Sequence, residues 1–295
     1  MRYSRVKKNQ TRKRYATFIL VVLLGFGLIY VIFAGTLGKF VSNLILPILS
    51  GEQAEGGQGT DTDDPILTLP DDTNEPVADT VKITDTLKAN ALALYGIQMG
   101  AFTDEENAKA FSQELKTRGG AGYVYNDGFY RVMAIGFQSE EDANQVRNEL
   151  KTDEIESHVY KLTTAGADME ITATVENIAE IRSAYEIWEQ KYRSMEDVIV
   201  SLDSGAISSL EAADKIQVLK TEMEQKRDKL QEMNANQNNN VVLAGLVKLY
   251  DDSCQSLDII LAKNTSDKVA ISSEIKYTYI DMLMQYKDYM EQITQ

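Results

Sequence analysis

The chain has 295 residues, of which 43% are hydrophobic, and this length allows two modest domains with connecting segments. Its formal net charge is −15, but residues 1–15 contain seven basic residues and no acidic ones. The remainder therefore carries 23 basic and 45 acidic residues, a net charge of −22. We expect no nucleic-acid partner, because binding to phosphates requires Lys and Arg in excess.

The sequence contains one cysteine, Cys254, and one histidine, His158. These numbers exclude an intramolecular disulfide and a closed Cys/His zinc site. We expect both residues to be structural, with Cys254 acting as a small buried hydrophobe. The sequence predicts no metal site and no cofactor.

Residues 16–38 contain no charged side chain and are predicted to form a transmembrane helix, because about 20 apolar residues span a ~30 Å hydrocarbon layer. The basic segment 1–15 would then be a cytoplasmic tail, with the rest of the chain outside the cytoplasm. An alternative interpretation is a cleaved signal peptide, since Ala34-Gly35-Thr36 is a cluster of small residues. The apolar run is longer than a usual signal peptide, which favours an uncleaved anchor.

Residues 39–89 are predicted to be an extracytoplasmic linker. Its first part, residues 40–49, is apolar and broken by Pro47. This part would lie along the membrane interface or extend the anchor. Residues 50–80 are rich in Gly, Pro and acidic residues without apolar periodicity, which is typical of a flexible spacer.

One pattern occurs twice, 35 residues apart. Residues 95–102 precede Glu105-Glu-Asn-Ala108, and residues 130–137 precede Glu140-Glu-Asp-Ala143. A repeat at a fixed offset indicates two copies of a strand followed by a helix. The first helix is predicted to begin at a capping box formed by Thr103 and Glu106, and the second at Ser139.

Two further strands complete the predicted order βαββαβ. Strands are expected at residues 93–99, 123–125, 129–134 and 157–162, with a hairpin turn at Asn126-Asp-Gly128. This order is typical of a ferredoxin-like sheet with both helices on one face.

Side-chain alternation predicts what each face of the sheet presents. Ile97 and Val132 should point toward the helices, so their neighbours should point to the other face, called here the outer face. Gln98, Phe129, Arg131 and Met133 are thereby placed together on the outer face. Such a group would form a platform for a polar ligand; the alternative is a sheet face that simply contacts water.

The segment Tyr95-Gly-Ile-Gln98-Met-Gly-Ala-Phe102, the pair Asn107-Ala108 and the segment Gly128-Phe-Tyr-Arg131-Val132 resemble the sporulation-related repeat (SPOR) domain. The resemblance covers residues 90–162. It implies a βαββαβ domain that binds peptidoglycan glycan strands stripped of their stem peptides at bacterial septa. The family's strand-one glutamine, its aromatic before the third strand and its third-strand arginine correspond to Gln98, Phe129 and Arg131.

The predicted glycan-binding residues combine this correspondence with the aromatic side chains nearby, since sugars present hydroxyls to polar donors and flat C–H faces to rings. They are Gln98, Phe129, Arg131, Met133, Tyr123 and Tyr125. No catalytic residue and no metal ligand is predicted.

Residues 170–294 show apolar side chains at alternating spacings of three and four, including Trp188, which predicts four amphipathic helices. An antiparallel four-helix bundle is expected, with an extended coiled coil as the alternative. The stripe of Trp, Tyr and Met residues could bind a protein partner, but such stripes more often form a core. The expected fold class is thus α+β: a transmembrane helix, an acidic linker, a SPOR-like domain and an all-α region.

The sequence suggests three alternative functions. The first is a single-pass, non-catalytic protein of the bacterial cell membrane that binds peptidoglycan at the division or sporulation septum. The second is a cell-wall hydrolase or a regulator of one, with the helical region as effector; a zinc amidase would need more His or Glu ligands than one histidine supplies. The third, RNA binding, conflicts with the acidic charge.

Overall fold

The computed structural model describes residues 81–235 and 240–294. The predicted cytoplasmic tail, the transmembrane helix and residues 39–80 of the predicted linker lie outside the described residues. Within the part of the chain that the structure describes, no helix combines the length and apolar character needed to cross a membrane.

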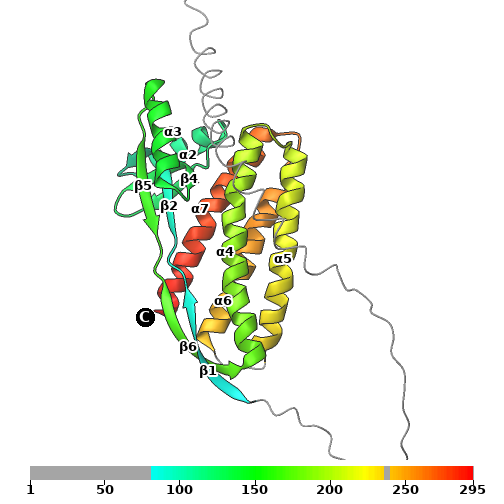
Figure 1. Cartoon of the computed structure of the whole chain (residues 1–295). Helices are drawn as coiled ribbons and strands as arrows, with labels where there is room; N and C mark the ends of the chain where they lie inside the picture. The colour runs from blue at the N-terminus through cyan, green and yellow to red at the C-terminus, as the bar shows by residue number, and fades with distance from the viewer. Residues whose placement is uncertain (1–80, 236–239, 295) are drawn as a thin grey trace, which may run out of the picture. The chain divides into compact units, whose positions relative to one another are not determined.

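A four-stranded antiparallel sheet with strand order β3-β4-β2-β5 occupies the repeat region (Figure 1). Its elements follow in the order β2 (Ala93–Phe102), α2 (Glu105–Lys116), β3 (Tyr123–Asn126), β4 (Tyr130–Phe137), α3 (Glu140–Thr152) and β5 (His158–Thr163). The first and third strands of the repeat lie at the centre, as the ferredoxin-like arrangement requires. The predicted βαββαβ order is confirmed.

The two helices of the repeat begin at side-chain caps. Ser139 caps α3 as predicted, because its hydroxyl oxygen accepts a hydrogen bond from the backbone N–H of Asp142 at 3.3 Å. The cap of α2 is Asp104, which accepts from the N–H of Asn107 at 2.9 Å, so the predicted capping box at Thr103 is wrong by one residue. Both Asp and Thr are good caps, and spacing alone did not distinguish them.

Between α2, α3 and the sheet lies a small apolar core. Val132 of β4 packs with Ala108 and Leu115 of α2, and Ile97 of β2 is also fully buried. Val132 therefore points toward the helices as predicted, and Ile97 is buried as that prediction requires. Because side chains alternate along a strand, their neighbours point to the outer face.

A second sheet, a two-stranded antiparallel ribbon, precedes and follows the repeat. It pairs β1 (Lys82–Ala89) with β6 (Ala167–Thr174) and packs against the first long helix of the C-terminal region. The sequence placed β1 inside the linker 39–89 and the start of the helical region at residue 170. Both boundaries are corrected here: Lys82–Ala89 is a strand, and helix begins only after Thr174.

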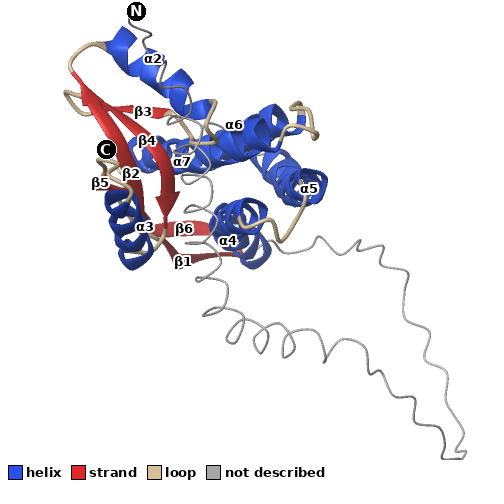
Figure 2. Cartoon of the chain, turned by 90° about the horizontal axis from the view of Figure 1, so that it is seen from above, coloured by secondary structure: helices blue, strands red, loops and turns tan. Residues whose placement is uncertain are grey.

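Four consecutive helices follow in residues 175–293. They are α4 (Val175–Asp203), α5 (Ser209–Ala235), α6 (Val241–Leu261) and α7 (Lys268–Ile293). Each packs against the next, and α7 also packs against α4, which closes the group into a bundle (Figure 2). The bundle alternative is therefore the one observed, rather than an extended coiled coil.

Aromatic rings fill the contact between α4 and α7. Trp188 stacks on Tyr286 with ring centroids 4.9 Å apart, and Tyr192 stacks on Tyr279 at 4.8 Å. The indole N–H of Trp188 donates to the hydroxyl of Ser253 on α6 at 3.0 Å, so its polar atom is satisfied. The predicted aromatic stripe is thus core and cannot serve as an exposed partner-binding surface.

The same bundle contacts the sheet through α7, which packs against β4 and β3; Figure 1 shows α7 beside the sheet. The Tyr277 ring lies 5.0 Å from the Tyr123 ring of β3, and Ser273 donates to the carbonyl of Gly120 at 2.8 Å. The outer face, expected to be open, is therefore partly covered.

The residues of β4 explain why the outer face of the sheet is covered by the bundle. Val132 and Ala134 pack toward α2, so Met133, Ile135 and Phe137 project to the outer face. These three side chains are 0%, 7% and 1% exposed. An apolar row of this kind costs free energy in water, and burial against the bundle removes that cost.

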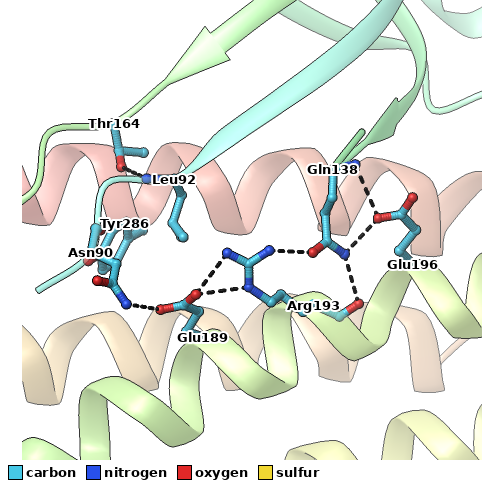
Figure 3. Close-up of polar contacts among 8 residues, drawn as sticks. All are labelled: Asn90, Leu92, Gln138, Thr164, Glu189, Arg193, Glu196 and Tyr286. Carbon is cyan, nitrogen blue, oxygen red and sulfur yellow. Dashed lines mark hydrogen bonds and ion pairs between the residues drawn. The ribbon is translucent and has the colours of Figure 1, made fainter. Parts of the chain in front are cut away.

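Polar contacts also link Gln138 and Asn90 to the bundle (Figure 3). The Arg193 guanidinium lies between Glu189 on its own helix and the side chain of Gln138, just after β4. Asn90, at the end of β1, donates to Glu189 at 2.9 Å, and its carbonyl accepts from the Tyr286 hydroxyl at 2.8 Å. The repeat region and the bundle therefore share both an apolar and a polar interface.

Candidate binding site

Gln98 and Arg131, predicted as ligand contacts, lie together on the outer face. Nη1 of Arg131 donates a hydrogen bond to Oε1 of Gln98, with 3.0 Å between the two atoms. The two strands that carry them are irregularly paired: Gln98 pairs with Met133, whereas Ala101 pairs with Arg131, with register shifts between. The register shifts place Gln98 opposite Met133, so that it shares a face with Arg131 two residues away along β4.

Asp127 holds the arginine in place. Arg131 Nε lies 2.9 Å from each carboxylate oxygen of Asp127, and the Tyr160 hydroxyl donates to the same carboxylate at 2.5 Å. We call Gln98, Asp127, Arg131 and Tyr160 the arginine cluster. Charge-assisted hydrogen bonds of this kind fix the orientation of a guanidinium more firmly than neutral ones.

The electrostatics of the arginine cluster follow from these bonds. The hydrogen bond from Tyr160, together with that from Arg131, lowers the pKa of Asp127 below its ordinary value. Conversely, the bond to Asp127 raises the pKa of Arg131 and that of the Tyr160 phenol. At neutral pH the carboxylate and the guanidinium are both ionised, so their charges cancel.

Aromatic rings border the arginine cluster. The guanidinium carbon of Arg131 lies 4.6 Å from the ring centroid of Tyr160 and 5.7 Å from that of Phe129. Tyr125 lies beside Tyr160 at 6.0 Å, and Phe129 is 48% exposed. Of the predicted site residues, Gln98, Phe129, Arg131 and Tyr125 are thus brought together.

The remaining two predicted residues are not available in the same way. Met133 is fully buried, so no ligand can reach it while α7 occupies the outer face. Tyr123 packs on Tyr277, and burial raises the pKa of its phenol. Their inclusion assumed an uncovered outer face, and the cover by α7 was not evident from the repeat alone.

Two residues of the site were missed from the sequence. Asp127 was assigned only to the hairpin turn, and Tyr160 was left without a face. The signal for Tyr160 is its register, since it pairs with Gly96 of β2 and so shares the outer face with Gln98 two residues further on. For Asp127, an acidic residue four positions before a functional arginine was the available signal.

This arrangement presents the partly exposed side chains of Arg131 and Asp127 beside flat rings, whereas Gln98 is only 7% exposed and accepts the hydrogen bond from Arg131. Such a surface is suited to binding a polar ligand with apolar faces, as carbohydrates have. Within residues 81–235 and 240–294, no group of three or more His, Cys, Asp or Glu side chains is placed to hold a metal ion. The fold and the site together define a ferredoxin-like binding module.

Comparison with known families identifies this module. Residues 91–161 match the family model described as the SPOR domain. The SPOR domain is a peptidoglycan-binding domain and not a catalytic one. Neither the comparison with curated proteins nor that with solved structures gave a match.

Proposed function

We propose that this protein is a membrane-anchored, non-catalytic peptidoglycan receptor that binds denuded glycan strands at the bacterial septum through its arginine cluster. The observation that carries the proposal is the juxtaposition of Gln98, Arg131 and the exposed Phe129 on the outer face of a SPOR domain. The N-terminal apolar segment 16–38 would anchor the chain and the acidic linker would let the module reach the wall.

The test is co-sedimentation of residues 82–295 with purified sacculi, before and after amidase treatment. Residues 82–295 are used because the SPOR domain shares an apolar interface with the bundle. We expect more protein to pellet with amidase-treated sacculi. The double substitution Gln98→Ala/Arg131→Ala should reduce pelleting about tenfold or more, because two hydrogen-bonding side chains are lost.

Matched controls separate a lost site from a lost fold. Lys248→Gln changes an exposed side chain on α6 and should pellet like the wild type. Circular dichroism should show the same helix content in all variants. Equal pelleting by wild type and the double variant would refute the proposed site, and no pelleting by the wild type with either preparation would refute the proposed activity.

Membrane anchoring and septal position are tested in cells. A fluorescent fusion to the full chain should fractionate with membranes and concentrate at septa, whereas the same fusion lacking residues 1–38 should leave the membrane fraction. A uniform membrane signal in dividing and sporulating cells would contradict the septal part of the proposal. A full-length fusion found in the soluble fraction would contradict the anchor.

A further inference from the structure

The glycan site suggested by the sequence lies on the SPOR domain alone, but the structure places a second element beside it. Helix α7 covers the part of the outer face that carries Met133, Ile135 and Phe137. What remains accessible is the end of the face that carries the arginine cluster, Tyr125 and Phe129. At this end of the face, α7 approaches the sheet at Tyr125.

Lys287 is the basic residue that α7 brings to this end of the face. Its ammonium nitrogen lies 5.9 Å from the ring centroid of Tyr125, and Tyr125 in turn lies 6.0 Å from the Tyr160 ring of the arginine cluster. The acidic residues Asp281 and Asp288 of the same helix act electrostatically on Tyr123, and Asp288 is exposed. Lys287 therefore sits at the border between α7 and the accessible rings.

The charge balance gives Lys287 a distinct role. Arg131 adds no net charge to the site, because Asp127 neutralises it through two contacts at 2.9 Å. Lys287 pairs with Glu291 at 3.5 Å, and the Glu291 side chain is 53% exposed. Exposed pairs of this kind are weak, so a ligand carboxylate can compete for the ammonium group.

We propose that the glycan site is a composite of the SPOR sheet and α7, in which Lys287 binds a carboxylate of the glycan. This inference rests on the proposed function. Amidase cleaves the amide bond between the lactyl group of muramic acid and the stem peptide, which leaves a carboxylate on the sugar. A glycan that keeps its stem peptide has a neutral amide at that position. Lys287 would therefore supply the preference for denuded strands, while the arginine cluster binds the sugar itself.

The experiment compares residues 82–295 with three variants, using sacculi with and without amidase treatment. Lys287→Gln should lower binding to amidase-treated sacculi about tenfold, as expected for loss of a charge-assisted contact, and should leave binding to untreated sacculi unchanged. Lys287→Arg, which keeps the cation, should retain the preference. Lys248→Gln should match the wild type. Raising the salt concentration should weaken the preference of the wild type more than that of Lys287→Gln.

The outcomes separate this inference from the proposed function. If Lys287→Gln keeps the full preference while Gln98→Ala/Arg131→Ala abolishes binding, the SPOR site stands and the composite site is refuted. If Lys287→Gln weakens binding to both kinds of sacculi equally, the side chain does not recognise the carboxylate and the inference is also refuted. A wild type that binds neither preparation refutes both proposals.

Discussion

Arg131 is held by Asp127 rather than left to rotate in solvent. The carboxylate contacts Nε, Gln98 accepts from Nη1, and the Tyr160 hydroxyl shares the same carboxylate. A long arginine side chain loses much conformational freedom when it binds a ligand. Here Asp127 already restricts the Arg131 side chain in the free protein. This preorganisation favours ligand binding.

Replacing Asp127 tests this preorganisation. Asp127→Asn keeps a turn-forming residue but removes the charge that orients the guanidinium. We expect about tenfold weaker binding to amidase-treated sacculi with an unchanged melting temperature. Tyr160→Phe removes one hydroxyl and keeps the ring, so it should have a smaller effect. Equal binding by Asp127→Asn and the wild type would show that the orientation of Arg131 does not limit affinity.

Glu196 is a buried carboxyl at the contact between α4 and the SPOR domain. It accepts from the Gln138 side chain at 2.6 Å and from the Tyr279 hydroxyl at 3.1 Å, yet burial dominates and raises its pKa. Because the pKa is higher in the folded state than in the unfolded state, the folded state binds more protons between these two values. The free energy of unfolding therefore falls as pH rises from about 4.5, the ordinary value, through the raised pKa.

Glu196→Gln should remove this dependence, since the amide keeps an acceptor and carries no charge. We expect the melting temperature of the variant, relative to wild type, to increase as pH rises from 4 to 8. Thermal unfolding followed by circular dichroism at several pH values measures the difference. A difference that stays constant across this range would contradict a raised pKa at Glu196.

At the scale of elements, a short, hydrogen-bonded junction connects the ribbon of β1 and β6 to the four-stranded sheet. Leu92 and Thr164 continue the pairing between the two sheets through a backbone bond at 2.9 Å and a bond to the Thr164 hydroxyl at 2.8 Å. Gly166 lies in this junction, where a Cβ atom would meet the Ala91 nitrogen at 2.8 Å and the Ala89 oxygen at 2.9 Å. Both are backbone atoms, so they cannot move aside as a side chain does.

Gly166→Ala should therefore destabilise the protein although the residue is on the surface. We expect a loss of about 1–3 kcal/mol in the free energy of unfolding, measured by urea denaturation. Ala165→Ser, one residue earlier on the exposed side of the chain, should have no measurable effect. A wild-type midpoint for Gly166→Ala would show that the junction relaxes freely.

Much of each element was predictable from local signals, and the exceptions have a common cause. The end of helix α4 at Asp203 follows from the residue types there. The same is true of the turn at Gly128, which has a φ of +105°. The pairing of β1 with β6 joins segments separated by the whole SPOR domain. Ala167–Thr174 alternates between apolar and polar residues, but alternation does not identify the partner strand. Likewise, the row of Met133, Ile135 and Phe137 was visible, but the helix that covers it is far away in sequence.

At the scale of the whole described region, Lys276 connects three parts of the chain. Its ammonium group forms an ion pair with Asp203 at the end of α4, at 2.6 Å, and donates to the carbonyl of Gly119 after α2, at 2.8 Å. The Ser272 hydroxyl completes the group by donating to Asp203 at 2.6 Å. Both charged side chains are almost fully buried, so each depends on the other.

Lys276→Met leaves the Asp203 carboxylate buried without its cation. We expect a loss of about 3–5 kcal/mol in the free energy of unfolding. The sequence has a single tryptophan, Trp188, so its fluorescence reports unfolding of the bundle core during urea denaturation. The double variant Asp203→Asn/Lys276→Met should recover part of the loss. A single variant as stable as the wild type would contradict the role of this ion pair.

The shared apolar interface predicts that the SPOR domain depends on the bundle. A fragment of residues 90–162 would expose the row of Met133, Ile135 and Phe137 to water. We expect this fragment to bind a hydrophobic dye such as ANS and to melt at a lower temperature than residues 82–295. Equal melting temperatures and no dye binding would show that the row is tolerated in water.

The ribbon of β1 and β6 also shows how the structural units are arranged along the chain. Because β1 lies before the SPOR domain and β6 after it, the SPOR domain is an insertion within the loop of a hairpin that belongs to the helical unit. During synthesis, β1 leaves the ribosome long before its partner strand exists. Pairing of β1 with β6 therefore has to wait until the inserted SPOR domain has been synthesised, so the ribbon closes only after residues 167–174 have been made.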